Sequence, residues 1–419
     1  MRFRVLLLAA LAMLPPLFAE AGTLRVAAEP GALAAAIREA RPGDTLLLAK
    51  GTHAGPVTIK KPLVLAGEAG ARINGPGEGT VIAVQAPGVT IRGLAISGSG
   101  LRLDRLDAGI ALDAAAADAV IEGNRLEGNL IGIDVQGAPG ATLCGNVIRG
   151  RDDLRVPERG PGIYVWNAPG LLVEGNDIAL GRDGIFITTS DVAVYRGNRF
   201  SDLRYAFHSM YANRIEVLDN VSVGNEIGYA FMYSTRVIAR GNISQGDRSH
   251  GIFMNFANRS EIEQNAVIGG GEKCLFVYNA NRNSFRGNRF EGCDIGIHFT
   301  AGSEGNVLTR NAFVNNRTQV KYVGSRWLEW SEDGTGNYWS DHVAFDLDAD
   351  NRADSPYRPN DAVDQVVWRQ PMAKLLLGAP ALQLVRWSQS RFPGLLPGGV
   401  VDSFPLLDPG AAGPAGAPS

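Results

Sequence analysis

The stretch VEGNDIALGRDGIFITTSDVAVYRGNRF, from Val173 to Phe200, contains the same short phrase twice. Asn176 and Asn198 lie 22 positions apart, and each follows a Gly and precedes an apolar residue by two positions. Between them stand short β-branched and aromatic segments with apolar/polar alternation, a pattern typical of strands rather than helices. The stretch therefore predicts one repeat of 22 residues built from short strands.

The phrase returns along most of the chain. Its asparagines follow one another in steps of 22, 30, 22, 22, 22, 23, 23 and 23 residues, at Asn124, Asn146, Asn176, Asn198, Asn220, Asn242, Asn265, Asn288 and Asn311. A fixed period in this range is typical of a solenoid, whereas a β-propeller blade needs about twice the length. Three short strands and three turns fit each period, which predicts an all-β parallel β-helix with coils about 4.8 Å apart. The asparagines then form an internal ladder of amide hydrogen bonds.

Segments outside the repeat set the predicted domain boundaries. Residues 1–21 carry two arginines, a short apolar run and an Ala-Glu-Ala site, which predicts a cleaved signal peptide and export. Residues 22–340 are assigned to the β-helix, with a short amphipathic helix over Gly31–Ala40 that covers the first coil. Residues 341–419 are assigned to a C-terminal extension with an acidic loop, an amphipathic docking segment and a disordered end.

Charge and cysteine content exclude some classes of function. The 419 residues have a formal net charge of -3, which gives no indication of nucleic-acid binding. The three cysteines lack the spacing of a zinc site. Aligned on the repeat, Cys274 and Cys293 lie about three residues out of step on adjacent coils, roughly 10 Å apart. We therefore expect no disulfide between them.

Alternation along one strand of each coil predicts which side chains face outward. We use the word column for the residues at one position of successive coils. Two apolar columns are expected to face the interior, so the columns that alternate with them face outward. The outward columns are Asp134, Tyr164, Phe186, His208, Ala230, Phe253, Phe276 and His298, and Gln136, Trp166, Thr188, Met210, Met232, Asn255, Tyr278 and Thr300.

Soft and borderline metal ligands gather in these columns. Met210 and Met232 are neighbours on adjacent coils, about 5 Å apart in backbone, and His208 lies about 6 to 7 Å from Met210 along its strand. Thioether and imidazole suit Cu(I), so the three residues predict a shallow, exposed copper site. The alternative is a metal-free docking patch, because the aromatic neighbours extend an apolar stripe of the kind that marks a partner surface. These neighbours are Tyr164, Trp166, Phe186, Phe253, Phe276 and Tyr278.

Two features of the C-terminal extension suggest binding. One is a set of carboxylates with the first, third, fifth and ninth spacing of a calcium loop, namely Asp346, Asp348, Asp350 and Asp354. Asn351 replaces the usual Gly, and a solvated acidic turn is the alternative. The other feature is segment 365–408, which carries Trp368 and Trp387. We expect this segment to dock on a partner rather than to help the coils fold.

The order of motifs along the chain resembles that of the NosD family. After the coils come GNYWSD (336–341), SPYRPNDAVDQVVWRQPMAKLLL (355–377), VRWSQSRFP (385–393) and GVVDSFPL (399–406). The resemblance implies a right-handed parallel β-helix and a periplasmic accessory protein rather than an enzyme. It also implies a role in assembling the copper–sulfur centre of nitrous oxide reductase, with transient copper. The implied partners are an ABC transporter (permease and ATPase), through which the protein associates with the membrane, a copper-carrying lipoprotein and the reductase.

A polysaccharide lyase, epimerase or hydrolase on the same fold is the rival interpretation. Those reactions need carboxylates, or a base with a cation, crowded on one outer face. In the two outward columns the one acid is Asp134. The aromatic stripe is the feature that fits binding of sugar rings.

Overall fold

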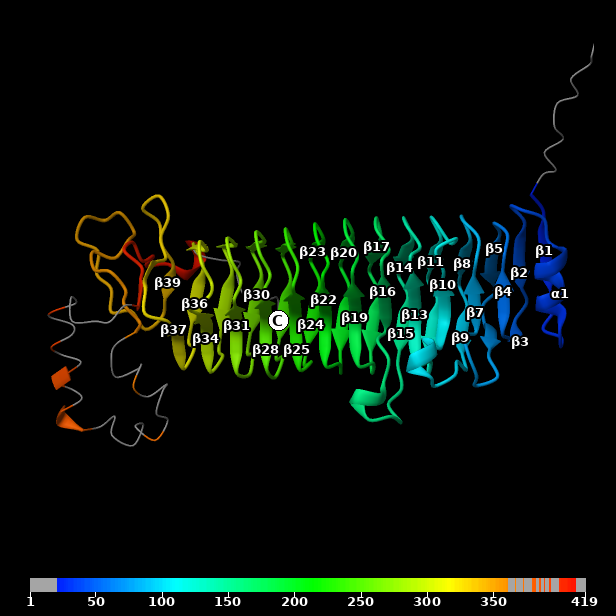
Figure 1. The fold of residues 1–419 in the computed structure, drawn as a ribbon, viewed down its shortest axis with the longest axis horizontal. Coiled ribbons are helices and arrows are strands. Elements are labelled where there is room, and N and C mark those ends of the chain that lie inside the picture. The colour runs from blue at the N-terminus through cyan, green and yellow to red at the C-terminus, as the bar shows by residue number, and fades with distance from the viewer. Residues whose placement is uncertain are drawn as a thin grey trace, which may run out of the picture.

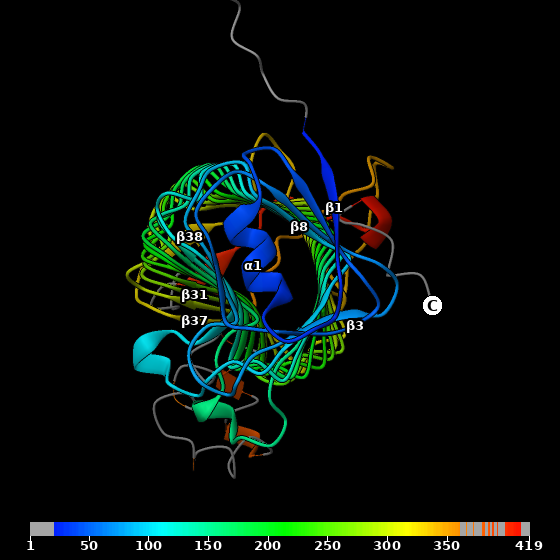
Figure 2. The same cartoon turned by 90° about the vertical axis from the view of Figure 1, so that its right-hand side faces the viewer.

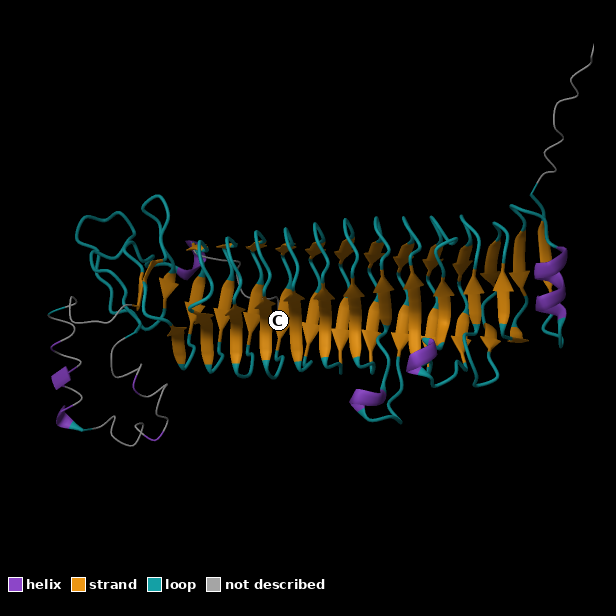
Figure 3. Ribbon diagram, in the orientation of Figure 1, coloured by secondary structure: helices purple, strands orange, loops and turns teal. Residues whose placement is uncertain are grey.

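The computed structural model describes residues 21–360 and 399–411, together with residues 366, 372, 379–381, 384, 385, 388 and 392. Nearly all of the predicted signal peptide, and both Trp368 and Trp387, lie outside these residues. Within them the chain forms an elongated solenoid of stacked coils, and three parallel sheets of 13, 13 and 12 strands run along its length (Figures 1 and 3). The predicted parallel β-helix is confirmed.

Each coil contributes one strand to each of three sheets, which we name A, B and C in the order in which a coil visits them. Sheet A contains β1 (Thr23–Val26), β2 (Thr45–Leu48), β5 (Val64–Gly67), β8 (Thr90–Arg92), β11 (Val120–Glu122), β14 (Thr142–Cys144), β17 (Leu172–Glu174), β20 (Val194–Arg196), β23 (Glu216–Leu218), β26 (Ile238–Arg240), β29 (Glu261–Glu263), β32 (Ser284–Arg286) and β35 (Val307–Thr309). Sheet B contains β3 (Gly51–Ala54), β6 (Ala71–Asn74), β9 (Ala95–Ser97), β12 (Arg125–Glu127), β15 (Val147–Arg149), β18 (Asp177–Ala179), β21 (Arg199–Ser201), β24 (Val221–Val223), β27 (Ile243–Gln245), β30 (Ala266–Ile268), β33 (Arg289–Glu291), β36 (Ala312–Val314) and β39 (Tyr338–Trp339).

Sheet C has the longest strands and carries the predicted site. It contains β4 (Val57–Ile59), β7 (Ile82–Val84), β10 (Ala108–Leu112), β13 (Ile131–Gln136), β16 (Ile163–Trp166), β19 (Asp183–Thr188), β22 (Tyr205–Met210), β25 (Ile227–Met232), β28 (His250–Asn255), β31 (Lys273–Tyr278), β34 (Ile295–Thr300) and β37 (Thr318–Val323). The remaining elements are short: α1 (Ala32–Glu39), the 3-10 turns Leu103–Arg105, Val156–Glu158 and Pro409–Ala411, and the paired strands β38 (Trp327–Glu329) and β40 (Gly399–Val401).

The predicted asparagine ladder is confirmed in the interior, at the turn between sheets A and B. In each coil the Asn Nδ2 donates to Oδ1 of the Asn in the next coil, as Asn176 does to Asn198 at 2.9 Å. The ladder continues through the one long step, where Asn146 donates to Asn176 at 3.0 Å. Because every coil places its Asn at the same turn, these bonds fix the register of all three sheets.

The ladder runs one coil further than the repeat predicts and ends on a distant carboxylate. Asn311 donates to Asn337 at 2.8 Å. Asp402 Oδ2 then accepts from the Asn337 backbone N–H at 2.7 Å, from Asn337 Nδ2 at 3.1 Å and from Trp339 Nε1 at 2.8 Å. Residues 399–402 thus complete the C-terminal end, with β40 on β38. The expectation that all of segment 365–408 stands apart from the coils is wrong for this part.

Asp402 is expected to make stability depend on pH. Burial raises its pKa to about 6, against hydrogen bonds from Trp339 and Asn337 that lower it. The native state therefore binds more protons than the unfolded chain, whose aspartate pKa is about 4. The contribution of Asp402 to stability is present in full below pH about 4 and is lost as pH rises through about 6.

The substitution Asp402→Asn tests the direction of this pH dependence. An Asn keeps an acceptor for Asn337 and Trp339 but cannot ionise. Relative to the parent, the variant should gain about 3 kcal/mol of unfolding free energy as pH rises across that window. Urea unfolding of both proteins at several pH values measures the difference, and other titrating groups cancel because both proteins share them. A difference that stays constant with pH would contradict the assignment.

The N-terminal end is closed by the predicted helix. Helix α1 lies across the open first coil, as the end-on view shows (Figure 2). Its buried residues are Leu33 and Ile37, four positions apart and therefore on one face. The two ends of the solenoid are thus capped by different segments. Among the described residues, no helix is long and apolar enough to cross a membrane.

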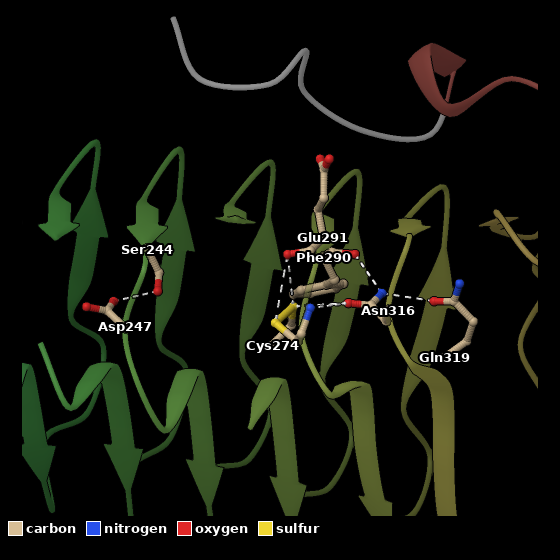
Figure 4. The surroundings of a disulfide bond; sticks show 8 residues. Ser244, Asp247, Cys274, Phe290, Glu291, Asn316 and Gln319 are labelled. Carbon is tan, nitrogen blue, oxygen red and sulfur yellow. Dashed lines mark hydrogen bonds between the residues drawn. A yellow bond between two sulfur atoms is a disulfide. The ribbon is translucent and has the colours of Figure 1, made fainter. Parts of the chain in front are cut away.

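Cys274 and Cys293 form a disulfide, so the expectation of two separate thiols is wrong. Their Cα atoms are 5.7 Å apart. An extended strand over the three residues that separate the two positions would hold the cysteines roughly 10 Å apart. Cys293 lies instead in the turn between β33 and β34, and this turn brings it to the buried Cys274. Figure 4 shows the bond beside Asn316, whose Oδ1 accepts from the Cys293 N–H at 2.9 Å. A bridge across a loop of this size typically adds about 3 kcal/mol.

Candidate functional site

The outer face of sheet C has the predicted register. Strand pairing aligns Phe186 with His208 and His208 with Ala230. It also aligns Met210 with Met232. Both outward columns match the sequence-based alignment wherever strand pairing connects their members. The two thioethers therefore stem from directly opposed positions of adjacent parallel strands, about 4.8 Å apart, and both are half-buried.

His208 faces the same side but is buried, so the prediction of an exposed imidazole is wrong. Only 7% of the residue is exposed. Its ring stacks on Phe186, with centroids 4.8 Å apart, and on Tyr205, with centroids 4.4 Å apart. Ala206 and Phe207 are both buried in the core, so the inward/outward alternation breaks there and Tyr205 lies on the outer face beside His208. Strict alternation from the sequence cannot reveal this break.

A buried ion-pair cluster lies beneath the imidazole. Asp183 is fully buried and accepts two hydrogen bonds from Arg204, at 3.0 and 2.9 Å. His208 Nδ1 lies 3.5 Å from Asp183 Oδ2, and His208 Nε2 is buried without a hydrogen-bond partner. Burial would raise the pKa of Asp183, but the bonds from His208 and Arg204 outweigh it and hold the pKa below its ordinary value. A carboxylate facing Nδ1 favours the tautomer that leaves Nε2 free as a ligand atom.

A second aromatic cluster occupies the same face towards the C-terminal end. Phe253 and Phe276 stack with centroids 5.0 Å apart, and His298 stacks on Phe276 at 4.7 Å. Burial, with smaller effects of Lys321 and Lys273, lowers the pKa of His298 to about 4. Burial also lowers the pKa of His250, which meets both phenylalanine rings edge-on. Both imidazoles are therefore neutral at pH 7.

The predicted docking residues lie along this face with unequal exposure. Trp166 is 44% and Tyr278 41% exposed. Four other predicted docking residues are half-buried, because neighbouring rings cover one another: Tyr164, Phe186, Phe253 and Phe276. Sequence reasoning missed three further exposed rings, Tyr211, Tyr233 and Phe256, which directly follow Met210, Met232 and Asn255. Their position immediately after the second outward column is the signal that could have identified them.

The acidic loop folds as a turn that uses its own carboxylates. Asp346 accepts from the backbone N–H of Ala349 at 2.7 Å and of Asn351 at 3.0 Å. Asp346, Asp348 and Asp350 offer oxygens within 4.8 Å of one another, whereas Asp354 accepts from the Leu347 N–H. Repulsion by Asp350, the largest effect, raises the pKa of Asp348. Calcium binding here stays a prediction.

Acids on the outer face of sheet C are few and separated. Asp134 is buried, accepts from Gln136 Nε2 at 2.6 Å, and has its pKa raised to about 6 by burial. Asp183, which the two predicted columns did not include, is engaged by Arg204. One strand, β16, lies between β13, which carries Asp134, and β19, which carries Asp183. A glycosidase pair needs two carboxyl groups facing one bond, and these two do not form one.

Comparison with known proteins identifies the family of this chain. Residues 144–344 match a family model described as periplasmic copper-binding protein (NosD). A relative from Pseudomonas aeruginosa, named probable ABC transporter binding protein NosD, is 42% identical over 380 residues, which cover 88% of this chain and 89% of the relative. The chain belongs to the NosD family. Another NosD family member with the same name, from Stutzerimonas stutzeri, is 40% identical over 374 residues, 86% of each chain.

Solved structures similar to this NosD family chain share its fold. The A-module of the Azotobacter vinelandii mannuronan C-5 epimerase AlgE4 has a TM-score of 0.55 at 14% identity, covering 67% of this chain and 90% of the module. A family 28 exopolygalacturonase from Yersinia enterocolitica has a TM-score of 0.56 at 11% identity, covering 73% and 77%. At these identities the likeness establishes the parallel β-helix and nothing about activity.

Proposed function

We propose that this chain is a periplasmic accessory protein that handles Cu(I) during assembly of the copper–sulfur centre of nitrous oxide reductase. Membership of the NosD family supports an accessory role, since its relatives are named as ABC transporter binding proteins. The family description supports copper binding and a periplasmic location. The protein would act with an ABC transporter and receive copper from a carrier lipoprotein, and it would catalyse no reaction on polysaccharides.

The proposal that copper binds at particular residues rests on one observation. Two thioethers, Met210 and Met232, are directly paired across β22 and β25. On the same outer face, two residues from Met210, lies His208, whose Nε2 is buried and lacks a partner. Two soft sulfurs and one imidazole form a ligand set that suits Cu(I). The Asp183 carboxylate near Nδ1 supplies the hydrogen-bonded support that metal-binding histidines usually have.

The environment of these ligands suits a carrier. The methionines are half-buried, so a partner can reach them, while stacked strands hold their backbones without loop rearrangement. Tyr205 and Phe186 stack on the imidazole, so Nε2 would reach an ion only after these rings move. Copper here is cargo, and a site of three neutral ligands binds Cu(I) while leaving room for a partner's ligand.

The disulfide is consistent with export. A buried bridge between Cys274 and Cys293 fits an oxidising compartment, such as the bacterial periplasm. The thiol of Cys144 is free and half-buried, and burial raises its pKa, which keeps it protonated at pH 7. These cysteines therefore do not compete with the methionines as thiolate ligands.

Copper content of the reductase in cells tests the proposed function. A strain lacking this chain should make a folded reductase that is deficient in the copper–sulfur centre, and the parent gene should restore it. Metal analysis and the visible spectrum of the purified reductase give the readout. A reductase with full copper content in the deletion strain would contradict the proposal. Incubating the protein with alginate or pectin and detecting cleaved or unsaturated products would instead favour the enzyme interpretation.

A further inference from the structure

The corner that follows sheet C repeats a four-residue pattern in four successive coils. The segments are YANR (211–214), YSTR (233–236), FANR (256–259) and NANR (279–282). Each of the first three begins with an aromatic residue, and all four end with Arg. Earlier coils have GAPG (137–140), NAPG (167–170) and TSDV (189–192) at the same corner. The same bend is therefore built elsewhere in this chain without aromatic or basic side chains.

The backbone conformation at this corner does not require aromatic residues or arginines. Tyr211, Tyr233 and Phe256 have φ of 54°, 49° and 52°. The arginines that end the four segments have φ between 52° and 57°, at Arg214, Arg236, Arg259 and Arg282. Gly or Asn adopts this left-handed conformation at lower cost than a residue with a bulky side chain, and Gly140 and Gly170 do so in earlier coils. Folding therefore does not explain the choice of side chains.

The middle positions of each segment carry the structural role. Ala212, Ser234 and Ala257 are fully buried. The polar third position links coil to coil, as when Thr235 Oγ1 donates to Asn213 Oδ1 at 2.8 Å and the Asn281 N–H donates to Asn258 Oδ1 at 2.7 Å. Apart from the half-buried Asn279, the first and fourth positions are exposed, and their side chains contribute little to this framework.

The exposed positions together form a surface with two halves, which we name the corner surface. Its aromatic half is a stack in which the rings of Tyr211 and Tyr233, and those of Tyr233 and Phe256, are 5.2 Å apart. These rings are 51%, 41% and 39% exposed. Its basic half is the arginine column. Within the described part of the chain, Arg236, Arg259 and Arg282 make no ion pair, while Arg214 pairs with Asp191 at 3.0 Å.

A cleft lies at the basic half. It has a volume of about 740 Å³ and is lined by Thr235, Asn258, Arg259, Asn281, Arg282, Gly302, Glu304 and Gly305. Glu304, the acid in the lining, is paired with Arg326 at 2.7 Å. Two arginines and several amide groups thus face a concave polar space beside an apolar stack. Guanidinium groups bind carboxylates with two parallel hydrogen bonds.

We propose that the corner surface binds an acidic segment of a partner protein. Carboxylates would pair with Arg236, Arg259 and Arg282, and apolar side chains of the segment would rest on Tyr233 and Phe256. A concave, amide-lined cleft suits a peptide better than a membrane, which requires a convex apolar face inserted among lipids. Because Tyr211 and Tyr233 directly follow Met210 and Met232, the bound segment lies beside the methionine pair. The inference does not depend on copper binding there.

Fluorescence anisotropy with purified protein tests the inference. The probe is a short labelled peptide of alternating Glu and Leu, compared with the same peptide carrying Gln in place of Glu. One variant is Arg236→Gln/Arg259→Gln/Arg282→Gln. Its matched control, Arg72→Gln/Arg125→Gln/Arg199→Gln, removes the same charge from exposed positions on sheet B. A second variant, Tyr233→Asn/Phe256→Asn, introduces the residue that Asn279 already provides at this position.

The parent should bind the Glu peptide and not the Gln peptide, and added salt should weaken binding. The corner triple variant should bind about tenfold or more weakly, the aromatic variant several-fold more weakly, and the sheet B control nearly as the parent does. If both triple variants lost the same affinity for the Glu peptide, net charge alone would explain the loss, and the inference would be overturned. Failure of the parent to bind would overturn it as well. Binding of anionic phospholipid vesicles or oligogalacturonate through these residues, without peptide binding, would also overturn it.

Discussion

Asn220→Ala is expected to lower the free energy of unfolding by at least about 3 kcal/mol. Asn220 is fully buried, and its Oδ1 accepts from both the backbone N–H and Nδ2 of Asn198, each at 2.9 Å. Its Nδ2 donates to the Tyr195 carbonyl and to Asn242 Oδ1, again at 2.9 Å. Alanine leaves these buried groups without partners, and each such group costs about 1–3 kcal/mol.

Urea unfolding followed by circular dichroism measures this loss. Arg199→Ala is a suitable control, because Arg199 directly follows ladder residue Asn198 but is exposed on sheet B. Its stability should stay within about 0.5 kcal/mol of the parent. If Asn220→Ala were no less stable than this control, the ladder would not hold the coils in register, and the column assignments would lose their physical basis.

Met210→Leu/Met232→Leu is expected to weaken Cu(I) binding by at least about a hundredfold. Changing one supporting partner of a metal ligand typically costs 10–100-fold, and this variant removes two of three proposed ligands. Leu nearly matches Met in volume and apolarity, so folding should be preserved. Anaerobic titration against a chelator of known Cu(I) affinity gives the dissociation constants of both proteins.

The control for this titration is Met254→Leu. Met254 is fully buried in the core and is not available to an ion. It should bind Cu(I) as the parent does. If the double variant also binds Cu(I) as the parent does, the methionine pair is an apolar patch and the metal ligands lie elsewhere.

The repetitive part of the fold could be predicted because one constraint recurs in every coil. The asparagine at a fixed turn defines the period, and parity along the following strand then separates inward from outward side chains. This parity predicts adjacent positions for Met210 and Met232, and their strand pairing confirms it. Long runs of equivalent residues average out local irregularities, so the assignment survives the 30-residue step between Asn146 and Asn176.

Features that depend on local breaks or distant contacts could not be predicted. The broken alternation at Ala206 places Tyr205 and Asp183 beside His208, and strict alternation along the strand does not predict it. A recurring small residue at this position, such as Gly184 and Gly228 in neighbouring coils, is the signal that could have located the break. The Cys274–Cys293 bridge depends on the path of one turn. Asp402 meets Asn337 across 65 residues of non-repetitive sequence, so spacing gave no indication that it ends the ladder.

X-ray absorption at the copper edge tests the central claim most directly. The protein would be loaded anaerobically with one equivalent of Cu(I) and compared with Met210→Leu/Met232→Leu and His208→Ala. The proposed site predicts two sulfur neighbours and one imidazole nitrogen in the parent. It also predicts loss of both sulfurs in the methionine variant and of the imidazole signal in the histidine variant. A copper environment of nitrogen and oxygen alone, or one unchanged by these substitutions, would contradict the assignment.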